Sequence, residues 1–442
     1  MTKRVEIAVV GAGAAGLFAS IWAGRSFVGH RTGAVVAVDG ASKLGAKILV
    51  AGGGRCNVTH HAVDESAYAG SSRNAIRNVL RRFDVPRTIE FFRDWGVELK
   101  REETGKLFPV TDDGQSVLHA LLEATRRAGT DVLHPWRVAS IERTNHGFVL
   151  HREELEGGSG AATRRGAGDS ENRILARRVI LATGGKSLPK TGSDGLGFEF
   201  AKSLGHSITN RVFPALVPLT IPKDHWLTGL SGVTFPATLE LRAPGGKRLA
   251  SFTNSTLITH FGLSGPSVLD MSRYFTEAKM NASAGPPPML VLNWLPGETL
   301  DAMDARLAAA GRTRGTSVLR VLEGKLAERV LRAICAGAGL DPSLSLSEMP
   351  KDKRRALAIA LTELPLPITG DRGYLFAEAT AGGVPLAELK LDTMESRVCP
   401  GLHICGELCD VDGRVGGFNF QWAWASGYVA GCGAAAGVTT SA

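Results

Sequence analysis

The first forty residues alternate between apolar runs and glycines in a pattern typical of a β-α-β unit. Residues 4–10 are mostly apolar and β-forming, and residues 17–23 form an apolar run that predicts a helix. Gly11-Ala12-Gly13-Ala14-Ala15-Gly16 joins the two segments, and residues 35–38 (Val-Val-Ala-Val) predict a second strand. A strand that turns on glycines into a helix is the phosphate-binding unit of dinucleotide-binding folds.

Each glycine of this turn has a separate expected role. Gly11 permits the tight turn, Gly13 lets a pyrophosphate approach the backbone, and Gly16 lets the helix pack closely on the strand. The helix N-terminus offers free N–H groups to phosphate oxygens. Asp39, at the end of the second strand, is placed to accept hydrogen bonds from ribose hydroxyls. The alternative is a structural turn that binds no ligand.

The stretch 42–59 combines four glycines with Lys43, Lys47 and Arg55. We expect an irregular, positively charged loop whose backbone lies close to the bound dinucleotide, and the alternative is a flexible surface linker. Further along, the pattern predicts two helices over 73–95 broken at Pro86, a hairpin over 97–109, a helix over 115–128 and strands over 131–152.

The middle of the chain changes in composition, which predicts four parts. Residues 1–189 form the first part of a dinucleotide-binding domain, which includes a low-complexity, solvent-exposed hairpin tip over 156–173. Residues 190–298 predict a β-rich, barrel-like insert, and 299–367 a helical subdomain. Residues 368–442 return to the first domain. The expected class is therefore α/β: a Rossmann-like domain interrupted by an insert.

Two later stretches repeat the combination of strand and glycine. Residues 178–185 form an apolar strand that ends in Ala-Thr-Gly-Gly. Residues 402–413 form a strand followed by a Gly-Glu cluster, and Gly416-Gly417 then leads into a helix. A second helix N-terminus at the ligand would stabilise negative charge there.

Charge and cysteine content narrow the function classes. The formal net charge is +8, but it is spread thinly, and a nucleic-acid partner would need a concentrated basic patch. No apolar run is long enough to span a membrane, and the first strand starts too early for a signal peptide, which predicts a cytoplasmic protein. The six cysteines include no CxxC pair and no zinc-type spacing, so no metal site is expected.

Several motifs, spread from end to end, resemble the bacterial flavoprotein family that includes bile-acid-reducing and aminoacetone-oxidising FAD enzymes. The matching segments are GAGAAG at 11–16, KLGAKILVAGGGRCNVT at 43–59, GKLFPVTDDGQSV at 105–117, LATGGKSLPKTGSDGLG at 181–197, PALVPL at 214–219, THFGLSGPSVLD at 259–270, ATAGGV at 379–384 and GELCDVDGRVGGFNFQWAWASG at 406–427. The resemblance implies a glutathione-reductase-like FAD domain with an inserted domain, and NAD(P)H as a candidate transient reductant without a Rossmann domain of its own.

The resemblance also implies which residues hold FAD. They would contact the ADP half, the pyrophosphate, the ribityl chain and the flavin ring, with Val138 meeting the adenine through its backbone. The implied cofactor-binding residues are Gly11, Gly13, Ala14, Ala15, Gly16, Asp39, Gly40, Lys47, Gly53, Gly54, Arg55, Cys56, Asn57, Val138, Ala182, Thr183, Gly184, Gly185, Gly406, Glu407, Asp412, Gly416, Gly417, Asn419, Phe420 and Gln421.

Two residues are candidates for the chemistry itself. His260, beside a Gly-rich turn of the insert, could transfer a proton to or from a substrate, or could simply order its loop. Cys56 lies in a basic loop that could lower its pKa, although a small buried packing residue is the preferred interpretation.

Four functions remain open at this point. The leading hypothesis is flavin hydride transfer with a small organic substrate, as a reductase using NAD(P)H or as an amine or aminoketone oxidase using oxygen. A flavin monooxygenase would need a steady NADPH site, which is not evident. An FAD-binding protein that acts on RNA is disfavoured by the thin charge distribution. The oligomeric state is not predicted.

Overall fold

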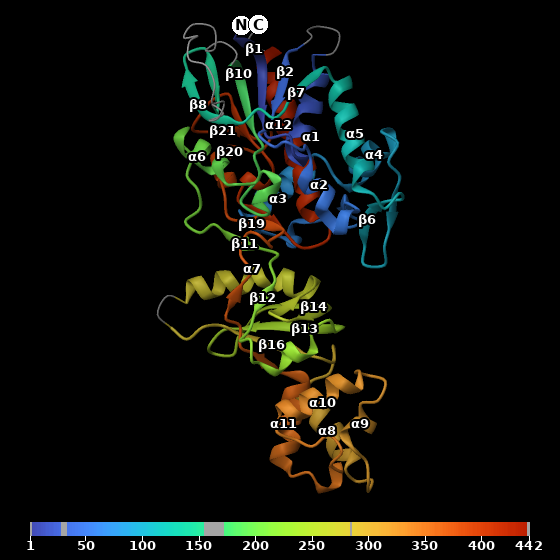
Figure 1. Cartoon of the computed structure of the whole chain (residues 1–442). Helices are drawn as coiled ribbons and strands as arrows, with labels where there is room; N and C mark the ends of the chain where they lie inside the picture. The colour runs from blue at the N-terminus through green and yellow to red at the C-terminus, as the bar shows by residue number, and fades with distance from the viewer. Residues whose placement is uncertain (1, 28–32, 154–171, 283–284, 440–442) are drawn as a thin grey trace, which may run out of the picture. The chain divides into compact units, whose positions relative to one another are not determined.

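The structure, a computed structural model, describes residues 2–27, 33–153, 172–282 and 285–439 (Figure 1). The chain forms two compact units, one made of Met1–Pro214 and Glu378–Ala442 and the other of Ala215–Ala377. Each unit has its own buried hydrophobic cluster. The low-complexity tip expected over 156–173 lies almost wholly outside the described residues.

Unit 1 is built around a mainly parallel sheet. Its parallel strands lie in the order β7, β2, β1, β10, β22, with the antiparallel strands β21 and β20 beyond β22 and the hairpin β8–β9 on β10. The strands of this sheet are β1 (Lys3–Val10), β2 (Val35–Val38), β7 (Thr130–Leu133), β8 (Val138–Thr144), β9 (Gly147–Arg152), β10 (Arg173–Leu181), β20 (Leu389–Lys390), β21 (Glu395–Ser396) and β22 (Leu402–Ile404). The Rossmann-like fold class predicted from the sequence is confirmed.

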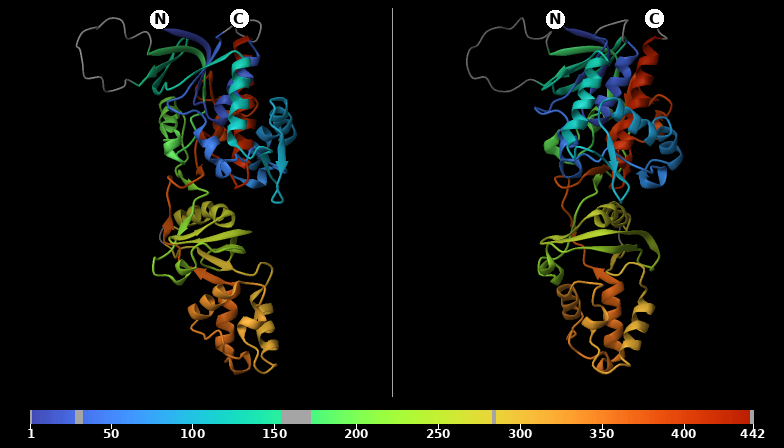
Figure 2. Two further views of the ribbon diagram at one scale, coloured as in Figure 1. Left: turned by 45° about the vertical axis from the view of Figure 1, so that its right-hand side comes forward. Right: turned by 90° about the vertical axis from the view of Figure 1, so that its right-hand side faces the viewer.

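Helices cover this sheet, and the closest pair consists of α1 and α12. The helices of unit 1 are α1 (Ala14–Arg25), α2 (Ala46–Val50), α3 (Arg73–Leu80), α4 (Val85–Asp94), α5 (Gly114–Arg127), α6 (Leu196–Ser203) and α12 (Phe418–Thr439). A Cβ on Gly427 of α12 would lie 2.7 Å from the Ala15 oxygen of α1, and one on Gly431 would lie 2.4 Å from the Ala19 oxygen. The two backbones therefore approach closely along a stripe of small residues (Figure 2).

Two local predictions are wrong. Residues 46–50 within the expected irregular loop form the short helix α2, although Gly52 and Gly53 after it do have positive φ. The break between α3 and α4 falls at 81–84, before Pro86. Pro86 lies in the first turn of α4, because a first-turn residue needs no N–H donor, and the Asp84 side chain caps that helix.

Smaller sheets lie beside this one, among them the pair β11 (Phe213–Ala215) and β19 (Ala379–Ala381). β3 (Thr59–His60) and β5 (Leu99–Arg101) flank β6 (Lys106–Pro109), and β4 (Tyr68–Gly70) pairs with β23 (Val411–Gly413). The last two small sheets connect the loop after β2 with the segment that leads into α12, so they matter for the site described below.

Unit 2 contains a seven-stranded sheet and a group of helices. The strands lie in the order β17 (Leu364–Leu366), β16 (Met289–Asn293), β13 (Thr234–Arg242), β14 (Arg248–Thr259), β15 (Gly262–Ser264), β12 (Leu219–Thr220) and β18 (Gly370–Asp371). The helices are α7 (Pro266–Asn281), α8 (Leu300–Ala310), α9 (Val318–Val321), α10 (Glu328–Gly337) and α11 (Lys351–Thr362). The pairings between these strands do not close the sheet, so the barrel-like character expected of the insert is not found.

The unit boundaries differ from those expected. Residues 190–214, which include α6, belong to unit 1 and not to the insert. Residues 368–377 belong to unit 2, because β18 pairs with β12. Within the described ranges, no helix is long and apolar enough to cross a lipid bilayer.

Candidate functional site

Register places the predicted glycine motifs at one edge of the sheet of unit 1. Val10 of β1 lies opposite Val38 of β2 and Leu181 of β10, and Leu181 lies opposite Ile404 of β22. All of these strands are parallel, so the segments that follow them begin at the same carboxyl edge, where open α/β sheets bind their ligands. The motifs that gather there start at Gly11, Asp39, Ala182 and Gly406.

Two glycines of the first turn are required by packing. Gly11 has φ +98°, and a Cβ there would lie 2.5 Å from the Ala182 oxygen. A Cβ on Gly16 would lie 1.8 Å from the Gly11 oxygen. Any side chain at either position would push the helix or the neighbouring strand away.

Gly13 is different, because neither its backbone nor its neighbours require glycine. Its φ is −82°, which any residue adopts, and a Cβ there would meet no atom within 4 Å. The open space lies at the N-terminus of α1, whose first turn holds no acidic side chain. A phosphate group that approaches the backbone there would explain why the position is glycine. The residues present therefore fit a bound pyrophosphate.

Asp39 holds the turn to the end of β2. One carboxylate oxygen accepts a hydrogen bond from the Ala12 N–H at 2.7 Å, and the other accepts one from the Ala41 N–H, also at 2.7 Å. Each oxygen keeps a second lone pair for a ribose hydroxyl, which remains a prediction. A Cβ on the neighbouring Gly40 would lie 3.0 Å from the Arg137 side chain, so the chain just before Val138 lies beside this turn.

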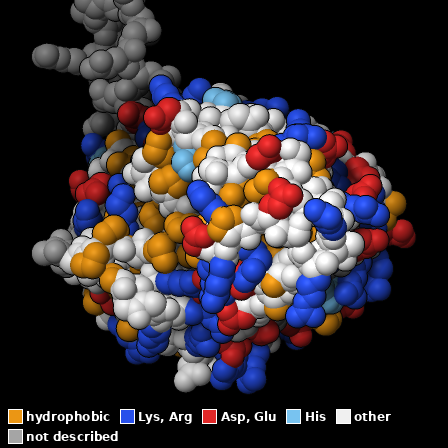
Figure 3. Space-filling view, turned by 90° about the horizontal axis from the view of Figure 1, so that it is seen from below, with side chains coloured by type: hydrophobic (Ala, Val, Ile, Leu, Met, Phe, Trp, Pro, Cys, Tyr) orange, Lys and Arg blue, Asp and Glu red, His pale blue; other side chains and the backbone are white. Residues whose placement is uncertain are grey.

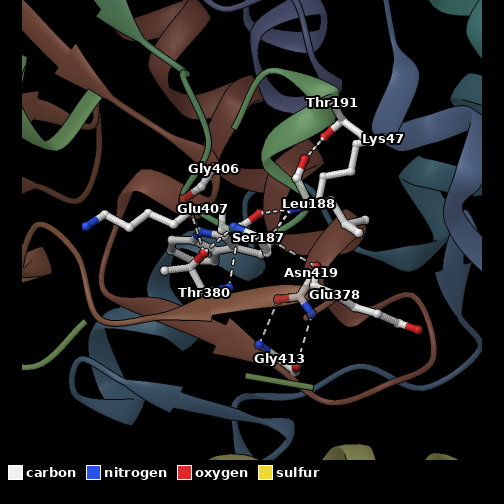
Figure 4. A network of polar contacts seen from close by, with 12 residues as sticks. Lys47, Ser187, Leu188, Thr191, Glu378, Thr380, Gly406, Glu407, Gly413 and Asn419 are labelled. Atoms are coloured by element: carbon white, nitrogen blue, oxygen red, sulfur yellow. Dashed lines mark hydrogen bonds and ion pairs between the residues drawn. The ribbon is translucent and has the colours of Figure 1, made fainter. Parts of the chain in front are cut away.

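Glu407 is the centre of a polar network on the same edge (Figure 4). Its Oε2 accepts a charged hydrogen bond from Lys47 Nζ at 2.6 Å. Its Oε1 accepts bonds from Ser187 Oγ at 2.8 Å and from the Thr380 N–H at 2.9 Å. The Lys47 and Glu407 side chains are only 28% and 18% exposed, so water weakens this ion pair less than it would a surface pair.

Thr380 ties two chain segments together beneath this network. Its Oγ1 accepts bonds from the backbone N–H groups of Lys186 at 2.8 Å and Ser187 at 3.0 Å. A Cβ on Gly185 would lie 2.4 Å from that oxygen, which explains the second glycine of the Ala-Thr-Gly-Gly strand end. Thr183 Oγ1 is buried and has no hydrogen-bond partner among the described residues. An unpartnered buried hydroxyl at this edge is consistent with a polar ligand.

The segment leading into α12 is held by the amides of Asn419 and Asn57. Asn419 Oδ1 accepts from the Gly413 N–H at 2.8 Å, and its Nδ2 donates to the Gly413 oxygen at 3.0 Å. With its amide oriented to satisfy both contacts, Asn57 accepts from the Gly417 N–H at 3.0 Å and donates to the Thr59 oxygen at 2.9 Å. Gly417 has φ +92°, and a Cβ there would lie 2.5 Å from the Thr59 backbone, so the loop after β2 lies against the start of α12.

Two of the expected cofactor-binding residues contact other side chains in the structure, and their cofactor contacts stay predictions. Arg55 pairs with Glu102 at 2.7 Å and lies over the Phe108 ring, so its side chain lies against the hairpin β5–β6. The Glu102 hydrogen bond raises the pKa of Arg55. Phe420 stacks on Trp424, with ring centroids 5.5 Å apart. The remaining expected contacts, among them Ala14, Ala15, Gly54, Gly184, Asp412 and Gly416, stay predictions.

Gln421 is also turned into the protein interior. Its Oε1 accepts bonds from Thr59 Oγ1 at 2.7 Å and Thr88 Oγ1 at 3.0 Å, and its Nε2 donates to the Phe83 oxygen at 2.9 Å. The residue is 1% exposed. The side chain joins α12 to β3 and α4, and the expected contact of Gln421 with the cofactor stays a prediction.

We expect Gln421→Met to lower the free energy of unfolding by about 2–4 kcal/mol, since it leaves two hydroxyls and a carbonyl without their partner. The measurement is urea denaturation of the apoprotein. Gln115→Met, at the exposed start of α5, is the control and should change stability by less than about 0.5 kcal/mol. Equal stability of the two variants would contradict the role of Gln421 in the interior.

The expectation of a lowered pKa at Cys56 is wrong. The side chain is fully buried, and burial raises the pKa of Cys56 to about 12. The positive charge of Arg55 is directed to Glu102 and Asp112, so the basic loop does not stabilise a thiolate. Cys56 belongs to the buried hydrophobic cluster of unit 1.

Cys56 should therefore resist iodoacetamide in the native protein near neutral pH and react only after unfolding, because the thiolate is the reactive form. Mass spectrometry of peptides after alkylation tests this. Cys56→Ala should keep turnover within about threefold of wild type. Rapid labelling of Cys56 in the native protein, or loss of turnover in a folded Cys56→Ala protein, would support a catalytic role for Cys56.

His260 lies in unit 2, in the turn between β14 and β15. The side chain is exposed, and its ring lies 5.1 Å from that of Phe261. Its accessibility is compatible with proton transfer, and its role remains a prediction.

Sequence reasoning missed several residues that build this edge. Ser187 and Thr380 were not singled out, although they lie inside the matching segments 181–197 and 379–384. Ser426 accepts from the Gly406 N–H at 3.0 Å, and Trp422 Nε1 donates to the Gly406 oxygen at 3.0 Å. In the sequence, Ser426 and Trp422 could have been noticed because each has a polar side-chain atom in an otherwise apolar helix. No cluster of three or more metal-ligating side chains occurs in the part of the chain that the structure describes.

The parallel sheet, the glycine turn and the polar network at its carboxyl edge define a Rossmann-type dinucleotide-binding protein. The chain belongs to the family described as HI0933-like protein Rossmann domain, whose model matches residues 5–433. It is an FAD-dependent oxidoreductase.

Two curated relatives and one solved structure are similar over nearly the whole chain. The 3-dehydro-bile acid delta(4,6)-reductase of Clostridium scindens is 33% identical and covers 97% of this chain and 99% of its own. The ribosomal RNA dihydrouridine synthase of Escherichia coli is 31% identical and covers 96% of this chain and 97% of its own. The 3-ketosteroid delta1-dehydrogenase of Sterolibacterium denitrificans, 12% identical with a TM-score of 0.50, covers 99% of this chain and 100% of its own and supports the fold alone.

Proposed function

We propose that the protein reduces a carbon–carbon double bond conjugated to a carbonyl group. The observation that carries this proposal is the similarity, over both whole chains, to relatives whose names describe saturation of such a bond. A delta(4,6)-reductase acts on ring double bonds of a 3-dehydro steroid, and dihydrouridine is uridine with its C5=C6 bond saturated. In both cases the double bond is conjugated to a carbonyl.

FAD, once reduced, supplies the hydride in this reaction. The hydride adds to the carbon farthest from the carbonyl, the electron pair moves to the carbonyl oxygen, and a proton then reaches the carbon next to the carbonyl. The chain contributes the open space beside Gly13 for the pyrophosphate and the Glu407 network that fixes the segments around it. His260 is our candidate proton donor.

The reductant is the next part of the proposal. NADH or NADPH would reduce the flavin transiently. Anaerobic stopped-flow mixing of the oxidised holoprotein with NADH, NADPH and a panel of amines tests this directly. Bleaching by a nicotinamide and not by amines supports the reductase. Bleaching by amines, with reoxidation by oxygen, would instead support the alternative of an amine or aminoketone oxidase.

RNA is a second candidate substrate, favoured specifically by the dihydrouridine synthase relatives. On the face that Figure 3 shows, Lys and Arg side chains are mixed with Asp and Glu side chains. This face therefore has no uniformly basic surface. Incubation of holoprotein with ribosomal RNA and a nicotinamide, followed by mass spectrometry of nucleosides, tests this candidate. A mass increase of two hydrogens on uridine would support RNA as the substrate. If uridine keeps its mass and a steroid enone is reduced, RNA is excluded as the substrate.

His260→Asn should slow reduction of substrate by at least about tenfold and leave the FAD content unchanged, because a proton donor contributes roughly 100-fold or more. Single-turnover rates from pre-reduced enzyme provide the measurement. His146→Asn, an exposed histidine in the turn between β8 and β9, is the control. Unchanged turnover in His260→Asn would leave the residue with a structural role.

A further inference from the structure

A cavity of about 250 Å³ opens on the surface of unit 1. Three segments that are distant in sequence form it: the junction between α3 and α4, the turn between β20 and β21, and the middle of α12. Pockets that hold small-molecule ligands start at about 300 Å³, so this cavity suits a compact ligand. The lining residues are Arg82, Arg87, Asp392, Tyr428, Val429 and Cys432.

The cavity is separate from the candidate cofactor site. α12 begins beside the carboxyl edge of the sheet, where Gly417 lies against the Thr59 backbone. Tyr428 and Cys432 lie ten and fourteen residues after Phe418, the first residue of α12. These separations correspond to about 15–21 Å along the helix axis. A molecule in this cavity would therefore be a second ligand, distinct from the flavin.

Three charged side chains line the cavity without forming an ion pair among the described residues. Arg82 and Arg87 are exposed, and Asp392 lies in the turn after β20. Opposite charges in contact would form an ion pair, so a gap separates the carboxylate from the two guanidinium groups. A ligand that spans this gap could contact both kinds of charge.

Arg87 lies at an unfavourable place in its own helix. It belongs to the first turn of α4, where the partial positive charge of the helix end disfavours a cation. Its guanidinium donates to the Arg82 backbone oxygen at 2.6 Å, and the guanidinium carbon lies 6.0 Å from the centroid of the Tyr428 ring. The other N–H donors of the guanidinium have no acceptor among the described residues. A bound anion would offset the unfavourable charge and accept from these donors.

We propose that this cavity binds a small phosphate ester that also carries an amino group, such as a nucleoside monophosphate. Two guanidinium groups match a phosphate dianion in charge, and the planar fork of each can donate two parallel bonds to phosphate oxygens. The Asp392 carboxylate accepts from the amino group, while Tyr428 and Val429 contact the apolar part of the ligand. This site does not depend on the proposed function.

The test is isothermal titration calorimetry of the full-length FAD-loaded protein with adenosine 5′-monophosphate, in excess FAD so that the nucleotide does not enter the cofactor site. Wild type should bind the nucleotide, and Arg82→Gln and Arg87→Gln should each bind it at least about tenfold more weakly. Arg73→Gln, at the exposed start of α3, removes the same charge outside the cavity and should bind like wild type.

Asp392→Ala tests the other end of the ligand. It should lower the affinity for adenosine 5′-monophosphate relative to the affinity for inorganic phosphate by at least about fivefold. Both ligands lose the repulsion between the carboxylate and the phosphate, but only the nucleotide also loses an acceptor for its amino group. An unchanged ratio would overturn the role of Asp392 and reduce the site to one for simple anions.

Cys432 provides a second readout inside the cavity. The other five cysteines are buried, so N-ethylmaleimide should label Cys432 first in the native protein. Saturating adenosine 5′-monophosphate should slow this labelling in wild type and leave the labelling rate of Arg87→Gln unchanged.

No binding by wild type, equal affinity of Arg87→Gln and wild type, or labelling of Cys432 that the nucleotide does not slow would overturn the proposal. Each variant must match wild type in melting temperature and FAD content. Arg87→Lys is a milder change if Arg87→Gln is unstable, and it should also bind more weakly, because an ammonium group lacks the planar fork.

Discussion

Gly13→Val is expected to fold normally and to bind FAD at least about 100-fold more weakly, a loss of roughly 2.8 kcal/mol. The backbone of Gly13 is in an ordinary extended conformation, and the space that a side chain would fill is empty of protein atoms. The valine methyl groups would occupy the place where the pyrophosphate meets the N–H groups of α1. FAD titration, followed by quenching of flavin fluorescence, measures the loss.

The neighbouring glycine provides the control for this prediction. Gly16→Val should destabilise the apoprotein itself, because its Cβ would lie 1.8 Å from the Gly11 oxygen. Thermal denaturation of the two apoproteins should therefore separate them, with Gly13→Val close to wild type. If Gly13→Val keeps wild-type FAD affinity, the pyrophosphate does not lie at this turn.

A double-mutant cycle at Lys47 and Glu407 should give a coupling energy of about 1–2 kcal/mol. Glu407→Gln alone should cost about 2–3 kcal/mol, since the Lys47 ammonium loses its counter-charge in a partly buried position. Lys47→Met should cost less, because Ser187 and the Thr380 N–H still hold the carboxylate. The free energy of unfolding of the apoproteins in urea is the quantity to compare.

The surface pair Lys3–Asp131 is the control for this cycle. Its N–O distance is 2.7 Å, almost the same as in the Lys47–Glu407 pair, but its side chains are 35% and 54% exposed. Its coupling should stay below about 0.5 kcal/mol. Equal coupling in the two pairs would show that the Glu407 network contributes no more than a surface contact.

The sequence predicted the elements that follow local rules. The glycine turn after β1, the acid after β2 and the strand end at Ala182 are read from spacing alone, and the register of parallel strands then brings them to one edge. The helix at Pro86 could also have been placed better, because proline in a first turn and an acidic N-cap are both local signals.

The rest depended on contacts that are distant in sequence. Arg55 lies in a stretch of phosphate-binding character, yet Glu102, 47 residues away, determines where its charge is directed. Gln421 fits a cofactor motif, but its partners Thr59 and Thr88 are more than 300 residues away.

Under the proposed function, reduced FAD in this protein saturates a conjugated double bond. The most direct measurement uses anaerobic, photoreduced holoprotein mixed with a 3-dehydro steroid carrying a conjugated double bond, or with uridine-containing RNA. We predict that one of these substrates reoxidises the flavin, with one double bond saturated per FAD. A flavin that stays reduced with both substrates, and is reoxidised only by oxygen, would contradict the account.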